Sequence, residues 1–304
     1  MRTNLDHLPE GKRRELAFVV DLLREGFAEA VRYRTSPRLK QGRLLKIVLY
    51  GSYARGGWVD DPVGRYHSDY DLLVVVDHED LTDIPEFWGK VERRLLDELA
   101  SGQNLRTPVS LIVHTLADVN EQLERGRYFF VDIRREGVVL FEESGSELVE
   151  PRALEAAEAH REATEYFEEW FATAGQFLHN ATDNASRGWN SVAAFNFHQA
   201  AERYYHCILL VWTLYTPKTH NLNKLRAQCE VLAPELAEAW PGVTKFERRC
   251  FELLREAYVK ARYSRQYKIA DEQLAWLAAR IAALRDLVDA VCRRRLDELA
   301  RAEV

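Results

Sequence analysis

Cysteine is scarce in this 304-residue chain, with only four examples scattered through its second half. No two of these cysteines form a Cys-x-x-Cys pair. This usage argues against a disulfide framework and against a cysteine-based zinc site. It is typical of reduced thiols in a cytoplasmic protein.

Long apolar runs and an excess of positive charge are also lacking. The longest apolar run, residues 207–215, is too short to span a bilayer. The first residues lack the apolar core of a signal peptide, so we expect a cytoplasmic protein without a membrane partner. The net charge of -6 gives no global attraction to nucleic acid, so any such binding must come from a local basic surface.

The apolar pattern divides the chain into two domains, 1–145 and 146–304, joined at an acidic stretch with Gly and Ser over 142–146. The first domain alternates strand-like and helix-like spacing, with helices expected over 12–33, 81–99 and 116–126 and strands over 46–50, 68–76 and 108–113. Residues 129–133 and 137–141 are expected to add strand and turn. The predicted fold is therefore an α+β domain with a small mixed sheet, followed by an all-α antiparallel bundle.

Five amphipathic helices are expected in the bundle. Thr244 and Glu247 form a capping box that begins one of them, and Asp271 is expected to cap the last. Short loops between such helices favour antiparallel packing.

The candidate catalytic and binding residues lie at the ends of two strand-like apolar runs. One run stops at Gly51-Ser52, and a second opens with Asp69 and Asp71. Side chains two apart on a strand share a face, so the two carboxylates are predicted to converge, as a Mg²⁺ site requires. Gly51 allows close backbone approach, and Ser52 is expected to cap a following helix whose N–H groups favour phosphate.

Gly-Ser followed by Asp-x-Asp resembles the DNA polymerase β superfamily, in its minimal and kanamycin-nucleotidyltransferase-like branch. The resemblance covers about residues 40–142. It implies a Mg²⁺-dependent nucleotidyltransferase that binds an NTP, expected to be ATP, and transfers a nucleoside monophosphate to an acceptor hydroxyl. Asp69 and Asp71 would be the catalytic metal ligands, and Gly51, Ser52 and Arg55 would contact the nucleotide.

Two departures from this family stand out. Residues 56–67 form a longer connection than usual, rich in Gly, Pro and Asp. The third carboxylate of the family falls at Ser110 if 108–114 is the matching strand. Serine binds metal weakly and is a poor general base. Asp118 and His114 are the nearby substitutes.

The helical half resembles a HEPN domain (higher eukaryote and prokaryote nucleotide-binding), a domain often fused to a minimal nucleotidyltransferase. The resemblance covers about residues 151–300 and rests on three segments, 193–203, 219–222 and 256–263. His198 and His220, within these segments, are expected to be hydrogen-bonded structural residues.

Many HEPN domains are RNases whose signature is an arginine followed, after four to six residues, by a histidine. No arginine of the helical half precedes a histidine at that spacing, and Tyr267 stands where the histidine would follow Arg262. Arg255, Tyr258 and Arg262 share one helix face and are candidates for contacting phosphates or the acceptor. A solvated helix face is the alternative interpretation.

Three functions therefore stay open. The leading one is the nucleotidyltransferase, with a small molecule, a protein tyrosine or an RNA end as acceptor and with a homodimer implied by the resemblance. The second is an RNA-binding or RNase toxin-like module, controlled as in toxin–antitoxin pairs by its fused domain. The third is a catalytically degenerate nucleotide sensor.

Overall fold

The computed structural model describes residues 1–58, 60–61, 66–217 and 219–302. The chain divides into two compact units, Met1–Ala153 and Leu154–Val304. Each unit has its own secondary structure and core, so they are described separately.

A four-stranded mixed sheet in the order β5-β4-β1-β6 forms the centre of the first unit. Strand β1 (Leu44–Tyr50) pairs antiparallel with β4 (Tyr70–Val76) and with β6 (Val138–Glu142). Strand β4 pairs parallel with β5 (Val109–Thr115), and helix α4 (Gly89–Ser101) supplies the crossover that a parallel pair needs.

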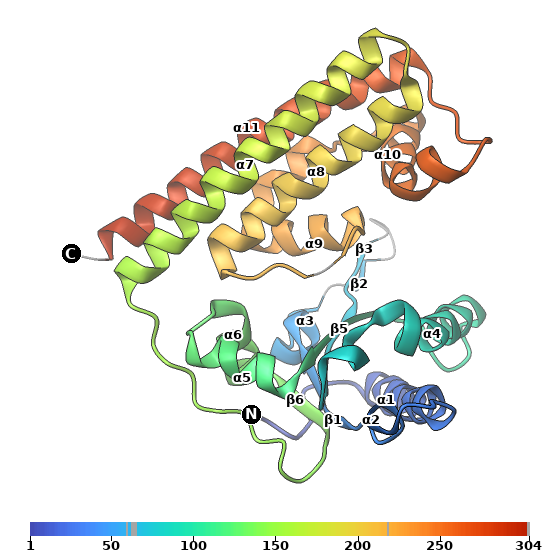
Figure 1. Cartoon of the computed structure of the whole chain (residues 1–304), viewed down its shortest axis with the longest axis vertical. Helices are drawn as coiled ribbons and strands as arrows, with labels where there is room; N and C mark the ends of the chain where they lie inside the picture. The colour runs from blue at the N-terminus through green and yellow to red at the C-terminus, as the bar shows by residue number, and fades with distance from the viewer. Residues whose placement is uncertain (59, 62–65, 218, 303–304) are drawn as a thin grey trace. The chain divides into compact units, whose positions relative to one another are not determined.

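Helices cover both faces of this sheet. Helices α1 (Glu10–Arg32) and α4 lie on one side, and α5 (Leu116–Glu124) and α6 (Tyr128–Glu136) lie on the other (Figure 1). Every residue of β4 except Asp71 is buried, as expected for a strand covered on both faces. The short elements are α2 (Pro37–Lys40), α3 (Gly51–Arg55), a 3-10 turn (Glu79–Thr82), a π-turn (Ile84–Trp88) and a two-stranded ribbon of β2 (Asp60–Asp61) with β3 (Tyr66–His67).

Two expectations for this unit are corrected. Residues 129–133, predicted as strand and turn, lie in helix α6, where Phe130 and Ile133 bury the same face at a spacing of three. The helix expected from residue 81 is interrupted, because the 3-10 and π turns come first and α4 begins only at Gly89. The strands expected over 46–50, 68–76 and 108–113 are present as β1, β4 and β5.

The second unit contains five α-helices among its described residues, and α7 runs alongside α11 (Figure 1). Their bounds are α7 (Ala156–Ser186), α8 (Asn190–Thr213), α9 (Leu222–Leu232), α10 (Lys245–Tyr263) and α11 (Asp271–Arg301), with a 3-10 turn at Pro234–Ala239. Helix α8 contacts α7, α9, α10 and α11, which explains its nearly continuous burial. In the described part of the chain, no helix has the length and apolarity needed to cross a membrane.

The two predicted caps of the bundle have different outcomes. The Thr244–Glu247 capping box is present at the start of α10. Asp271 is not the cap of α11, because Ala270 occupies the cap position. The Oδ1 atom of Asp271 instead accepts a hydrogen bond of 2.7 Å from Nδ2 of Asn190, which ties the starts of α8 and α11 together.

Two adjacent buried tyrosines of α8 give a stability test of this packing. The hydroxyl of Tyr205 accepts a hydrogen bond of 2.7 Å from Nε1 of Trp240, whereas the buried hydroxyl of Tyr204 has no partner among the described residues. We expect Tyr205→Phe to lower the free energy of unfolding by about 1–3 kcal/mol, because the buried Trp240 N–H loses its acceptor. Urea unfolding of full-length protein measures the change.

Tyr204→Phe is the matched control. It removes the same atom without orphaning a donor, so its stability should be unchanged or higher. Equal losses for the two variants would contradict this account of the core.

Candidate functional site

The carboxylate of Asp71 lies directly against the backbone of Gly51. Gly51 begins α3 at the end of β1 and has a φ of 74°. A Cβ at this position would lie 2.6 Å from Oδ2 of Asp71. Asp71 is also paired in register with Tyr50, the last residue of β1. The structure therefore brings Gly51 and Asp71 together, in a contact that a side chain at position 51 would block.

Asp69 lies one residue before the start of β4 and, like Asp71, is half-buried. No group of three or more His, Cys, Asp or Glu side chains in the described ranges is arranged to hold a metal ion. Any ion at this edge would therefore need ligands beyond the protein's own carboxylates, and phosphate oxygens are the usual ones for Mg²⁺.

Ser110 is the residue of β5 that pairs with Asp71 in the parallel register. Its side chain is buried, and register partners in neighbouring strands point to the same face. The strand pairing thus sets Ser110 beside Asp71, the position where the resemblance expects the third carboxylate.

The two proposed substitutes for this carboxylate lie elsewhere. His114 pairs with Val75 at the other end of β4, and its Nδ1 contacts Oδ2 of Asp118. Four residues of strand separate Ser110 from His114, which corresponds to roughly 13 Å. His114 and Asp118 therefore do not replace the missing carboxylate beside Asp71.

Ser52 and Arg55 both belong to α3. The expectation that Ser52 caps this helix is wrong, because Tyr50 occupies the cap position and no side chain caps it. Arg55 forms an ion pair with Glu136, with 3.6 Å between Nη1 and Oε2, and its side chain is 47% exposed. This pair holds α3 to α6.

A second polar cluster lies in the helical unit around Glu202. The Glu202 carboxylate is buried and lies 3.0 Å from Nδ1 of His220 and 3.6 Å from Nδ1 of His198. The ring of His220 stacks on Tyr258 with 4.0 Å between ring centroids. These contacts join α8, the segment before α9, and α10.

Arg262 covers the aromatic side of this cluster. Its guanidinium carbon lies 4.4 Å from the ring centroid of Tyr258 and 5.0 Å from that of Phe195. Its Nε donates to the carbonyl of Tyr258, and no carboxylate of the described residues lies within ion-pair distance of it. The predicted pair Tyr258 and Arg262 is thus together, and the structure adds Phe195, Glu202 and both histidines.

Burial controls the protonation of this cluster. Burial, followed by the charge of His220, lowers the pKa of His198 to about 3, and Arg262 adds to the effect. Burial likewise lowers the pKa of His206, one turn further along α8 than Glu202, to about 4. Burial raises the pKa of Glu202 despite its contact with His220. His198 and His206 are therefore neutral at pH 7. The buried Nε2 of His198 has no hydrogen-bond partner among the described residues, whereas Nδ1 of His220 is hydrogen-bonded to Glu202 as expected of a structural histidine.

Arg255 and Tyr267 make their contacts with other residues. Arg255 pairs with Glu252, with 3.2 Å between Nη1 and Oε1. The buried hydroxyl of Tyr267 donates a 2.9 Å hydrogen bond to the carbonyl of Leu253, and burial raises its pKa. A phenol in that state is not a general base at neutral pH.

Part of the helical unit matches a known protein family. The family model of the HEPN domain matches residues 167–288. This segment is a HEPN domain. No curated protein matches the chain. The HEPN match covers none of Met1–Ala153, so the function of that unit is argued from its geometry alone.

Glu202, the centre of the polar cluster in the HEPN domain (the HEPN cluster), was not identified from the sequence. The spacing of His198 and Glu202, four apart on one helix, was the available signal. The contact with His220 spans 18 residues and depends on how the loop after α8 folds back.

Gly51→Ala and Gly102→Ala form a matched pair for the contact with Asp71. Both glycines have positive φ, but a Cβ at Gly102 would meet no atom within 4 Å. We expect Gly102→Ala to lower the free energy of unfolding by about 1–2 kcal/mol, the ordinary cost of a left-handed residue. Gly51→Ala should cost clearly more, because Asp71 must move. Equal costs in urea unfolding would show that the carboxylate does not depend on Gly51.

Proposed function

We propose that the first unit binds a nucleoside triphosphate with Mg²⁺ and transfers its nucleoside monophosphate to an acceptor hydroxyl. The contact between Asp71 and Gly51 is the observation that carries this proposal. It joins a carboxylate at the head of β4 to the backbone at the start of α3, at one edge of the sheet. A phosphate chain and a hard cation need such a combination of groups.

The residues present fit a magnesium ion that is shared with substrate. Asp69 and Asp71 would hold it, since Mg²⁺ is usually bound by one or two carboxylates together with substrate phosphates. When bound, the ion would neutralise charge that develops on the phosphates. Gly51 leaves room for the Asp71 carboxylate, and the backbone of Gly51 and the hydroxyl of Ser52 lie at the same turn.

At position 110 the site lacks a carboxylate that could act as general base for the acceptor hydroxyl. Ser110 provides a hydroxyl instead of a carboxylate beside Asp71, and a hydroxyl is not ionised near pH 7. The geometry therefore supports nucleotide binding more strongly than rapid transfer. Binding of Mg²⁺ and NTP without pyrophosphate release, across a panel of small hydroxyl compounds, tyrosine peptides and RNA ends, would identify a nucleotide sensor instead.

Asp71→Asn tests the binding step. Wild type should be stabilised by one NTP only when Mg²⁺ is present, by roughly 2.7 kcal/mol at about 100 times Kd. Asp71→Asn should lose this stabilisation in a thermal-shift titration of the four NTPs, because it removes a charged ligand. Asp77→Asn, just beyond the other end of the strand, is the control and should keep it. A shift that survives in Asp71→Asn, or no shift in wild type, contradicts the proposal.

RNA binding by the HEPN domain is the second candidate. Arg262 lies over the rings of Phe195, Tyr258 and Tyr263, and the Tyr263 side chain is 76% exposed. Basic side chains with accessible aromatic rings bind phosphates and stack bases. Binding without cleavage is expected, because the hydroxyl of Tyr267 is engaged and no arginine–histidine signature is present in the helical half.

Arg262→Gln tests this candidate in fluorescence anisotropy with single-stranded RNA. Loss of one stacked contact is worth about 1–3 kcal/mol, so binding should weaken on the order of tenfold. Arg293→Gln is the matched control, since Arg293 also lies over a ring, that of Phe167, but is paired with Asp289. Equal affinities of wild type and Arg262→Gln would remove the HEPN cluster as an RNA site.

A further inference from the structure

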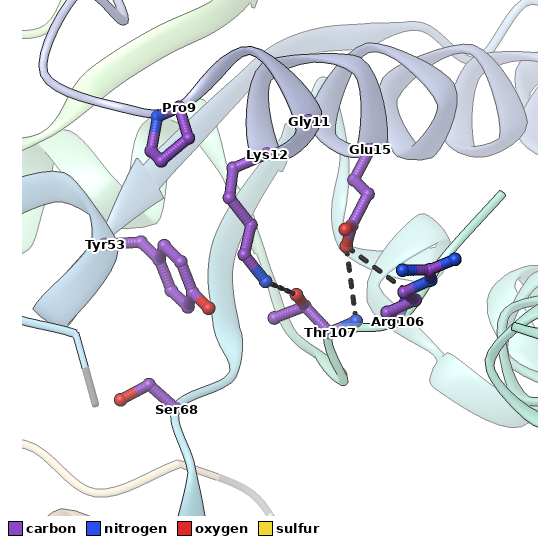
Figure 2. Close-up of a pocket in the computed structure, with 8 residues that line it drawn as sticks. All are labelled: Pro9, Gly11, Lys12, Glu15, Tyr53, Ser68, Arg106 and Thr107. Carbon is purple, nitrogen blue, oxygen red and sulfur yellow. Dashed lines mark hydrogen bonds between the residues drawn. The ribbon is translucent and has the colours of Figure 1, made fainter. Parts of the chain in front are cut away.

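A cavity of about 440 Å³ opens beside the first turn of α1 (Figure 2). Its lining combines two cations, one carboxylate, two hydroxyl groups and an aromatic ring, contributed by Lys12, Arg106, Glu15, Ser68, Thr107 and Tyr53. Small-molecule sites commonly have this size, and charged and hydroxyl-bearing side chains make up most of this lining.

Lys12 is the unusual member of this lining. Its Nζ donates a 2.6 Å hydrogen bond to Oγ1 of Thr107 and lies 5.5 Å from the ring centroid of Tyr53 (Figure 2). Within the part of the chain that the structure describes, no carboxylate lies within ion-pair distance of this ammonium group. A half-buried cation without an anionic partner favours binding of an anion.

Glu15, the carboxylate of the lining, is committed to the backbone instead. Its Oε2 accepts hydrogen bonds from the N–H groups of Arg106 and Thr107, at 3.3 and 3.2 Å. Tyr70 Oη also lies 3.5 Å from it. Glu15 therefore fixes the loop before β5 and leaves the charge of Lys12 to the cavity.

The cavity lies close to the Asp71 site, because its lining includes Tyr53 of α3 and Ser68, the residue before Asp69, but it faces the other side of β4. Tyr70 and Asp71 are successive residues of β4, so their side chains point to opposite faces of the sheet. The Tyr70 hydroxyl lies 3.4 Å from the carbonyl oxygen of Lys12 in α1, whereas Asp71 lies against Gly51. A ligand beside Lys12 would therefore lie on the α1 side of β4, and one beside Asp71 on the other side.

We propose that this cavity binds a small organic oxyanion, a phosphate monoester or a carboxylate, with its anionic group on Lys12. The side chains of Thr107 and Ser68 lie in the same lining. Arg106 adds a second positive charge at the rim. The proposal does not rest on nucleotide binding and goes beyond it.

Protection of Lys12 from acetylation tests this on wild-type, full-length protein. The probes are phenyl phosphate, benzoate, inorganic phosphate and, as a cationic control that cannot itself be acetylated, benzyltrimethylammonium. At about ten times its Kd a bound oxyanion should slow acetylation of Lys12 about tenfold in quantitative mass spectrometry, because only the free fraction reacts. Lys90, which is 71% exposed and pairs with Glu29, is the internal reference and should react at an unchanged rate.

The pattern of protection separates the possible ligands. Protection by phenyl phosphate alone indicates a phosphate monoester, and protection by benzoate indicates a carboxylate. Protection by inorganic phosphate alone, equal protection of Lys90, protection by benzyltrimethylammonium, or no protection would each overturn the proposal.

Two variants then keep this site distinct from the nucleotide site. Lys12→Met should abolish binding of the protecting probe in ligand-observed NMR, while Lys90→Met and Asp71→Asn should retain it. The Mg²⁺-dependent NTP shift should persist in Lys12→Met. Loss of probe binding in Asp71→Asn would show that the two sites are one and would overturn this inference.

Discussion

Strand β4 is the constraint on which the first unit depends. It is hydrogen-bonded to β1 on one side and to β5 on the other, and helices cover both of its faces. A strand held in this way cannot change register without exposing its apolar residues and burying polar ones. Asp71 is therefore fixed opposite Tyr50 and Ser110, and Gly51 is the residue that gives its carboxylate space.

Successive side chains of β4 point to opposite faces of the sheet, so Asp71 and Tyr70 meet different surroundings. Asp71 lies against Gly51 on one face, where we propose a cation shared with phosphate, while the Tyr70 hydroxyl on the other face lies near α1. In the helical unit, burial in the protein interior determines the chemistry of the polar cluster around Glu202. Burial keeps His198 neutral, and its neighbour Glu202 connects it to His220, so the cluster orders the loop after α8 instead of providing a free base.

Much of the secondary structure could be predicted from the sequence because it depends on local residue patterns. The strands and the Thr244 capping box follow from apolar spacing and short-range signals. The placement of Ser110 beside Asp71 came from the family resemblance. Residues 129–133 were misassigned because aromatic and β-branched residues favour strands, whereas packing here selects a helix. The Lys12 cavity was not predictable, since Lys12 and Thr107 are 95 residues apart and meet only in the folded sheet.

The most direct test of the central claim is whether Asp71 holds a metal ion together with a nucleotide. Mn²⁺ titrations followed by electron paramagnetic resonance, with and without a non-hydrolysable NTP analogue, measure this occupancy. The account predicts bound Mn²⁺ only when the analogue is present, and none in Asp71→Asn, because the protein offers too few ligands of its own. Mn²⁺ binding that is the same in wild type and Asp71→Asn, or that never depends on nucleotide, would contradict it.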